Sequence, residues 1–187
     1  MKNIAVFASG NGTNAERIIK YFEKSSIVQV NIVLTNNSNA GVIKRAQSLF
    51  VDAHVFNRND FYNSDKILDI LKQKNIDLIV LAGFLWLVPE SLIEKYQNRI
   101  INIHPALLPD YGGKGMYGQR VHEAVIEAGE PKSGITIHYV NKIYDNGQII
   151  FQAKVNIEKN DTPQSLAEKI HLLEYKHFPE VIESILF

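Results

Sequence analysis

"IDLIVLAGF", residues 76–84, is the most apolar stretch of the sequence and decides the fold class. Its composition is typical of a strand in the centre of a sheet that is covered on both faces. Shorter apolar runs of the same kind stand at residues 3–8, 28–35, 53–56 and 99–103. Between them, helical periodicity appears at residues 14–24, 42–50, 64–74 and 89–96. This alternation predicts a doubly wound, mostly parallel α/β sheet.

The second half of the sequence changes character. Residues 133–140 alternate apolar and polar positions, and residues 148–155 form another β-type run after the turn sequence Asp145-Asn146-Gly147. Together they predict an antiparallel addition to the sheet. Thr162 followed by Pro163 predicts the N-cap and first position of a last helix. The glycine-rich residues 111–118, which begin the stretch "YGGKGMYGQRVHEA", predict a mobile loop.

Composition limits the function classes. The 187 residues, 45% of them hydrophobic, suffice for one sizeable core, so we expect a single domain over residues 1–187. The balance of 20 basic and 20 acidic residues argues against general binding to nucleic acid or a membrane surface. The absence of cysteine excludes disulfides, thiolate zinc sites and cysteine nucleophiles. The start carries no signal-peptide pattern and no apolar run reaches the roughly 18 residues of a membrane span, which predicts a cytoplasmic protein.

The stretch "SGNGTN", residues 9–14, follows the first predicted strand and opens the first helix. Its two glycines let the backbone turn tightly and present N–H groups, and a helix N-terminus adds free donors and a positive dipole end. This combination predicts a site for a phosphate group. The stretch lacks the third glycine of the dinucleotide fingerprint and the Gly-Lys-Ser/Thr of a Walker loop. The structural alternative is a tight strand–helix turn that Thr13 or Asn14 caps.

Asn102 and His104 stand two residues apart near the end of a predicted strand, so their side chains share one face. Pro105 ends that strand. Ligands of open parallel sheets bind beyond the carboxyl ends of the strands. An amide and an imidazole at such a place suit the stabilisation of an oxyanion and the transfer of a proton beside it. For an isolated N-x-H pair, side chains that bond to the backbone are the commoner explanation.

Three further features have both a structural and a functional interpretation. Asp145 belongs to the turn-forming sequence Asp-Asn-Gly, which explains its presence without any function. A carboxylate near His104 would, however, orient the imidazole and favour its charged form. Residues 81–89, "LAGFLWLVP", predict either a slot for a flat heterocycle or a well-packed crossover. The other histidines have no carboxylate-supported metal-ligand spacing, so we expect ordinary core or surface histidines and no metal; they are His54, His122, His138, His171 and His177.

Taken together, these stretches resemble one family, the folate-dependent phosphoribosylglycinamide formyltransferases of purine synthesis. The matching pieces occur in the family's order over nearly the whole chain; they are "SGNGTN", "VLAGF", "NIHPALLP", "GITIHYV" with "YDNGQII", and "LLEYKHFPEVI". The pattern N-I-H-P-[SA]-L-L-P is specific to the formyltransferase fold, which is Rossmann-like. "SGNGTN" separates the glycinamide ribonucleotide branch from its relatives.

The resemblance implies a transferase that moves a formyl group from 10-formyltetrahydrofolate to the amine of N1-(5-phosphoribosyl)glycinamide (glycinamide ribonucleotide). The reaction would pass through a tetrahedral intermediate, without a metal or a covalent enzyme intermediate. The implied catalytic residues are Asn102, His104 and Asp145. The implied binding residues are Gly12, Thr13 and Asn14 for the substrate phosphate, Glu174 for the ribose, and Leu85, Trp86, Leu87 and Val88 for the folate. Both partners are small molecules, and we expect a monomer or a weak homodimer.

The sequence also departs from the family's pattern. His171 stands where relatives often carry a lysine near the phosphate, and "FYNSDK" stands where they often have a folate-holding arginine, near residue 64. Methionyl-tRNA formyltransferase and formyltetrahydrofolate hydrolase share parts of the site, but each usually carries an additional domain that we do not expect here. A non-catalytic nucleotide-binding module would use "SGNGTN" without needing Asn102, His104 and Asp145 together.

Overall fold

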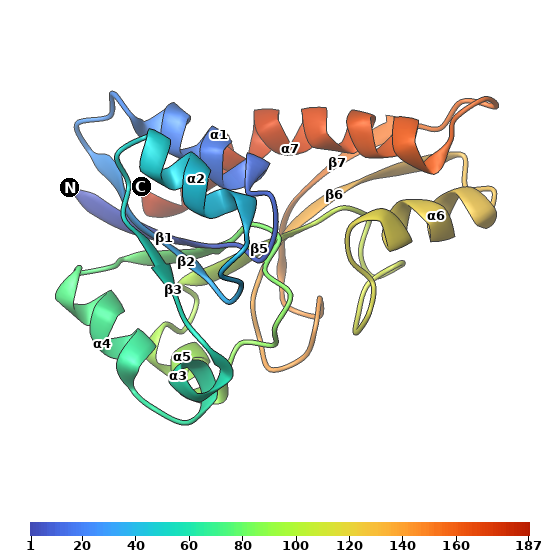
Figure 1. Ribbon diagram of the computed structural model, residues 1–187. Coiled ribbons are helices and arrows are strands. Elements are labelled where there is room, and N and C mark those ends of the chain that lie inside the picture. Colours follow the sequence, from blue (N-terminus) through green and yellow to red (C-terminus); the bar gives the residue numbers. More distant parts are fainter.

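The computed structural model describes residues 1–187 and contains one seven-stranded sheet in the order β3-β2-β1-β4-β5-β6-β7 (Figure 1). The strands are β1 (Lys2–Phe7), β2 (Val28–Thr35), β3 (Ala53–Val55), β4 (Leu78–Leu81), β5 (Ile100–His104), β6 (Lys132–Tyr139) and β7 (Ile149–Asn156). Strands β1 to β5 pair in parallel, whereas β6 is antiparallel to β5 and β7 is antiparallel to β6. The predicted mostly parallel sheet with an antiparallel addition is confirmed.

Helices cover both faces of this sheet (Figure 1). They are α1 (Thr13–Phe22), α2 (Gly41–Ser48), α3 (Arg58–Tyr62), α4 (Lys66–Gln73), α5 (Glu90–Lys95), α6 (Gln119–Glu127) and α7 (Pro163–Leu186). Buried residues of α1, α2, α6 and α7 share one core cluster with the sheet, and those of α3, α4 and α5 share a second. Successive residues of β1 alternate between the two clusters: Ile4 and Val6 lie in the first, Ala5 and Phe7 in the second.

Strand β4 lies between β1 and β5, and all four of its residues are buried. Because a helical layer covers each face, every side chain of β4 meets apolar surroundings whichever way it points. This explains why the stretch reads as a continuous apolar run. The chain leaves the sheet soon after Leu81 at Gly83, whose φ of 77° is a left-handed conformation that glycine adopts without steric cost.

Helix α7 is the longest element and begins as predicted. Thr162 is its N-cap, the Thr162 side chain accepts a hydrogen bond from an N–H three residues later, and Pro163 is the first helical residue. Pro179 lies inside the helix and has no N–H to donate to the Tyr175 carbonyl four residues earlier. Arg17 of α1 supplies the missing donor, since its Nε lies 3.0 Å from the Tyr175 oxygen. The helix therefore continues through a proline with that carbonyl satisfied.

Some boundaries differ from the sequence prediction. Helices α3 and α6 were not predicted. The glycine-rich loop ends at Gly118, and α6 begins at the next residue, Gln119. Pro89 is the N-cap of α5 and not its first helical residue. The connection between β6 and β7, residues 140–148, is longer than a tight hairpin turn. None of the helices is long and apolar enough to span a membrane.

Candidate active site

The three predicted catalytic side chains meet at the carboxyl end of β5. Asn102 and His104 lie on β5, and Asp145 reaches them from the connection between β6 and β7. Asn102 Nδ2 donates to Asp145 Oδ1 over 3.3 Å, and His104 Nδ1 lies 3.5 Å from Asp145 Oδ2. Asp145 has a φ of 53°, a left-handed conformation that Asp and Asn adopt more readily than most residues. The fold thus joins side chains that stand 43 positions apart in the sequence.

His104 is almost fully buried, with 3% of its surface exposed. Its Nε2 lies 2.7 Å from the Tyr111 carbonyl oxygen, and because a carbonyl only accepts, Nε2 carries a proton there. Nδ1 is then the nitrogen that titrates, and it faces Asp145. Burial lowers the pKa of His104, and the nearby Asp145 and Tyr111 oxygens offset this only in part. Asp145 thus favours the charged form of the ring, as expected, but desolvation is the larger effect on the pKa of His104.

The Asp145 carboxylate is the centre of the hydrogen-bond network. Besides Asn102 and His104 it contacts the glycine-rich loop, since Gly113 N–H donates to Oδ2 over 3.0 Å. Burial by itself raises the pKa of Asp145, but the His138 and His104 rings in their protonated forms and the Gly113 N–H together lower it below its ordinary value. The carboxylate consequently stays ionised at neutral pH and can hold an imidazole that becomes charged.

His138 is a site residue that the sequence interpretation missed. It lies opposite Asn102 in the β5–β6 pair, and its Nε2 is 3.1 Å from Asn102 Nδ2. His138 Nδ1 lies 2.8 Å from the Tyr139 carbonyl oxygen and so carries the proton, which leaves Nε2 as an acceptor. Both N–H groups of the Asn102 amide therefore have partners, His138 and Asp145. Asn102 can donate to a substrate oxygen only when one of these bonds opens, and the bond to Asp145 is the longer.

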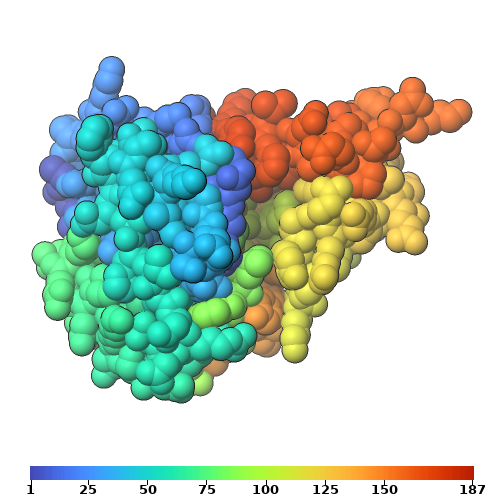
Figure 2. Space-filling model, in the orientation of Figure 1, coloured from blue at the N-terminus to red at the C-terminus, as the bar shows by residue number.

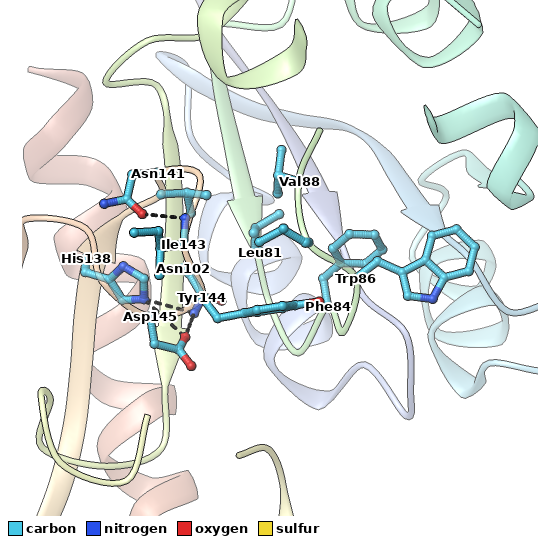
Figure 3. Close-up of a pocket in the computed structure, with 12 residues that line it drawn as sticks. Leu81, Phe84, Trp86, Val88, Asn102, His138, Asn141, Ile143, Tyr144 and Asp145 are labelled. Atoms are coloured by element: carbon cyan, nitrogen blue, oxygen red, sulfur yellow. Dashed lines mark hydrogen bonds and ion pairs between the residues drawn. The ribbon is translucent and has the colours of Figure 1, made fainter. Parts of the chain in front are cut away.

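A pocket opens beside this network (Figure 3). Asn102, His138 and Asp145 line it together with apolar residues that follow β4. Tyr144, next to Asp145, extends across it toward Phe84 (Figure 3). The space-filling view shows the surface hollowed between the cyan and green part of the chain and the yellow segment that carries α6 (Figure 2). Polar groups on one side and apolar side chains on the other suit a flat heterocycle that carries a reactive polar group.

The segment predicted to bind folate divides into two parts. The side chains of residues 86–88 line the pocket, whereas that of Leu85 does not and is 43% exposed. Two backbone groups of the segment are already engaged: Leu85 N–H donates to Ser9 Oγ, and Tyr62 Oη donates to the Leu87 carbonyl. These two groups are therefore not free to bond to a ligand in this structure.

The N-terminus of α1 has the features of an anion site. Gly12 is its N-cap with a φ of 77°, and a Cβ at this position would come within 2.4 Å of the Val42 side chain. The backbone N–H groups of Gly12, Thr13 and Asn14 have no hydrogen-bond partner within the protein. Free N–H donors at a helix N-terminus, with the positive end of the helix dipole, are the groups that bind phosphate.

Glu174 of α7 lies directly beside this loop. Its buried carboxylate accepts hydrogen bonds from Asn14 Nδ2 over 2.8 Å and from His171 Nδ1 over 2.9 Å. The Asn14 side chain is thus engaged, and only its backbone N–H is free for a ligand. The hydrogen bond to Glu174 raises the pKa of His171, so that a larger fraction of this ring is charged at neutral pH.

The remaining histidines do not line the pocket. His122 of α6 is buried, and desolvation lowers its pKa to about 4, so it is neutral. No group of three or more His, Cys, Asp or Glu side chains is placed to hold a metal ion.

The fold is that of a formyl transferase, and the model of the formyl transferase family matches residues 2–182. A phosphoribosylglycinamide formyltransferase of Bacillus subtilis is 36% identical over 100% of this chain and 95% of its own length. The crystal structure of the Bacillus halodurans phosphoribosylglycinamide formyltransferase superimposes with a TM-score of 0.88 at 36% identity, over 99% of this chain and 95% of that one. The chain belongs to the phosphoribosylglycinamide formyltransferase family.

A plant relative differs in length. The chloroplastic phosphoribosylglycinamide formyltransferase of Arabidopsis thaliana is 40% identical over 98% of this chain, which spans 65% of the plant protein. The chain likewise spans 61% of the corresponding Vigna unguiculata protein.

Inorganic phosphate should bind the N-terminus of α1. We expect a titration followed by amide NMR to shift the signals of Gly12, Thr13 and Asn14 first. Gly12→Ala should abolish these shifts, because a Cβ there meets Val42 and alanine disfavours a φ of 77°. Gly129→Ala is the matched control, since Gly129 also has a positive φ but has open space around it. Saturable shifts elsewhere with a silent α1 loop would show that the site is misplaced.

Asp145→Asn should lower the pKa of His104, because the carboxylate is the charge that raises it against burial. The amide keeps the turn propensity, so we expect an unchanged fold by circular dichroism and at least a ten-fold loss of turnover, of the order general acid–base support gives. NMR titration of the ring measures the pKa. Asp110→Asn, an exposed carboxylate, serves as control. An Asp145→Asn protein with wild-type turnover and an unshifted ring would leave Asp145 as a turn former only.

Proposed function

We propose that this protein transfers the formyl group of 10-formyltetrahydrofolate to the amine of glycinamide ribonucleotide. The observation that carries the proposal is the convergence of Asn102, His104 and Asp145 beside a pocket that Asn102 and Asp145 line. The free N–H groups of α1 supply a place for the phosphate of the ribonucleotide. The apolar side of the pocket supplies a place for the pterin ring. Relatives that are named for this activity, and that are 36–40% identical, support it.

The reaction needs one proton to move between two nitrogen atoms. The amine of the ribonucleotide attacks the formyl carbon, a C–N bond forms, and the carbonyl oxygen becomes an oxyanion. The attacking nitrogen loses a proton, and the folate nitrogen N10 gains one as its bond to the formyl carbon breaks. Atoms and charge then balance, with formylated ribonucleotide and tetrahydrofolate as products.

We assign the transfer of this proton to His104, which contacts Asp145, a residue of the pocket lining. Burial keeps the ring neutral at rest, so it can accept the proton from the amine. The charged ring then lies near two negative groups, the oxyanion and Asp145, which together favour the charged form. His104, or a water that it holds, passes the proton to N10 as the intermediate collapses.

Asn102 completes the stabilisation of the oxyanion. Its Nδ2 exchanges the longer bond, to Asp145, for a bond to the oxyanion and keeps the bond to His138. His138 therefore orients the amide and does not exchange protons in this scheme. The Asp145 oxygen that is released turns toward the imidazole, which carries a positive charge at this stage.

The test is a formyl-transfer assay with both substrates, applied to Asn102→Ala, His104→Ala and the double variant. We expect each single change to lower kcat by about 100- to 1000-fold while KM moves little, because the groups act on the transition state. His104→Ala should flatten the pH profile, and Asn102→Ala should preserve its shape, since an amide does not titrate. The two losses should not add, because both groups serve one tetrahedral centre. A change in KM alone would make the pair a binding feature, and no transfer by the unaltered protein would end the proposal.

We further propose that Arg58 holds the carboxylates of the folate tail. Its guanidinium lies 4.9 Å from the ring centre of Trp86, at the rim of the pocket. Nearby charges are neutralised by one another, as Asp60 pairs with Lys66 and Glu90 pairs with Lys142, whereas Arg58 has no ion-pair partner. A folate bound through its pterin directs its glutamyl carboxylates outward, and Arg58 is a cation placed to meet them.

Arg58→Gln should raise KM for 10-formyltetrahydrofolate several-fold and leave KM unchanged for 10-formyltetrahydropteroate, which has no glutamate. Arg99→Gln is the control, because Arg99 also stacks on an aromatic ring, 4.8 Å from the centre of Tyr96, but does not approach the pocket. An equal rise for both donors would show that Arg58 only supports Trp86.

The remaining expectations stay proposals. We place the reaction in the cytoplasm, treat residues 1–187 as one functional domain, and expect a monomer or weak homodimer.

A further inference from the structure

We propose that Arg45 is a positioning residue of the substrate's phosphate site: it fixes the Asn11–Gly12 peptide so that the Gly12 N–H points at the anion. This inference rests on the proposed phosphate site of α1 and concerns a residue that does not itself touch the substrate.

Arg45 lies in the last turn of α2 and reaches back over the start of that helix to the loop before α1. Its Nε donates to the Asn11 carbonyl oxygen over 2.9 Å, and its Nη2 lies 3.5 Å from Asn11 Oδ1. Its Nη1 pairs with the Glu16 carboxylate in the first turn of α1. One guanidinium therefore joins the loop to both flanking helices.

The loop has little of its own to hold this peptide in place. Asn11 stands between Gly10 and Gly12, residues with wide conformational freedom. Gly12 caps α1 without a side-chain hydrogen bond, because glycine has none to offer. The restraint on the Asn11–Gly12 peptide therefore has to come from residues outside the loop.

Helix α2 supplies that restraint at close range. Val42 N–H donates to the Gly10 carbonyl over 3.2 Å. A Cβ at Gly41 would come within 2.7 Å of Asn11 Oδ1, and one at Gly12 would come within 2.4 Å of Val42. The start of α2 thus contacts the loop backbone directly at Gly10, and Arg45 adds a contact to the following peptide, between Asn11 and Gly12.

The geometry of the peptide bond converts this contact into an orientation of the donor. The Asn11 carbonyl and the Gly12 N–H belong to one planar unit, and in a trans peptide they point in opposite directions. A guanidinium that holds the Asn11 oxygen on the α2 side therefore directs the Gly12 N–H to the other side. That N–H has no partner within the protein. The positive charge of the guanidinium beside the Asn11 oxygen also polarises the peptide, which strengthens the Gly12 N–H as a hydrogen-bond donor.

Lys20 provides a matched comparison within the same ion cluster. Glu16 pairs with both Lys20 and Arg45, and these pairings lower the pKa of Glu16. Replacing either cation by glutamine removes one positive charge from this cluster. Only Arg45 also contacts Asn11. The two substitutions therefore separate the positioning of the peptide from the loss of charge near the phosphate.

The experiment compares Arg45→Gln, Arg45→Lys and Lys20→Gln. Binding of inorganic phosphate is measured by NMR or calorimetry, which needs no activity. KM for each substrate and kcat are measured by steady-state kinetics. We expect Arg45→Gln to weaken phosphate binding and raise KM for glycinamide ribonucleotide at least five-fold, with KM for the folate and kcat at saturation within two-fold of wild type. Arg45→Lys should recover part of the loss, because it keeps a cation without the planar fork. Lys20→Gln should change each quantity less than two-fold.

Several outcomes would overturn the inference. Equal effects of Arg45→Gln and Lys20→Gln would reduce the role of Arg45 to charge. An equal rise in both KM values, or a loss of thermal stability that Arg45→Lys does not restore, would make Arg45 a general structural residue. Unchanged phosphate binding in Arg45→Gln would remove the role altogether. Failure of formyl transfer in the unaltered protein contradicts the proposed function but not this inference, because the phosphate measurement is independent of it.

Discussion

A carboxylate that is largely withdrawn from water needs hydrogen-bond donors around it, and at the partly buried Asp145 this requirement organises the active site. Withdrawing an ion from water costs on the order of several kcal/mol in a protein interior unless donors replace the lost hydration. Here the donors come from separate segments: the Asn102 amide from β5 and the Gly113 N–H from the glycine-rich loop. His104 of β5 faces the same carboxylate. The site is therefore complete only when the strand, the loop and the β6–β7 connection are all in place.

The reversal of strand direction at β6 makes this arrangement possible. The antiparallel register sets His138 opposite Asn102, so an imidazole and an amide meet across neighbouring strands. The chain after β6 must then turn back closely. A Cβ at Gly147 would come within 1.6 Å of the Tyr139 carbonyl oxygen, so the return path admits glycine only. The turn sequence Asp145-Asn146-Gly147 thus serves the packing of the strand end and the presentation of the carboxylate together.

Periodicity sufficed to predict the sheet, because β4 and its neighbours are covered on both faces and read as apolar runs. It failed for α3, whose five residues are too few to show a period, although the capping box between Asn57 and Asp60 marks its start. It failed for α6 because the glycine-rich stretch before it suggested a loop, and Gly118 at its start provides no side-chain cap. His138 could not be assigned from its own surroundings, since its partner is set by strand register. The protonation state of His104 follows from burial, which a motif does not report.

One serine joins the two proposed substrate sites. Ser9 N–H donates to the Gly83 carbonyl over 3.0 Å, and Ser9 Oγ accepts the Leu85 N–H over the same distance. Ser9 begins the phosphate loop, and residues 83–85 begin the segment that lines the pocket. Because β1 and β4 are adjacent parallel strands, both segments leave the sheet at the same edge, and the serine joins them where they emerge. A transfer between two bound molecules depends on holding their reacting atoms in one geometry. In this fold the pairing of β1 with β4 places the two segments, and the two hydrogen bonds of Ser9 join them beyond the strand ends, so that the side chains of the pocket act within a fixed frame.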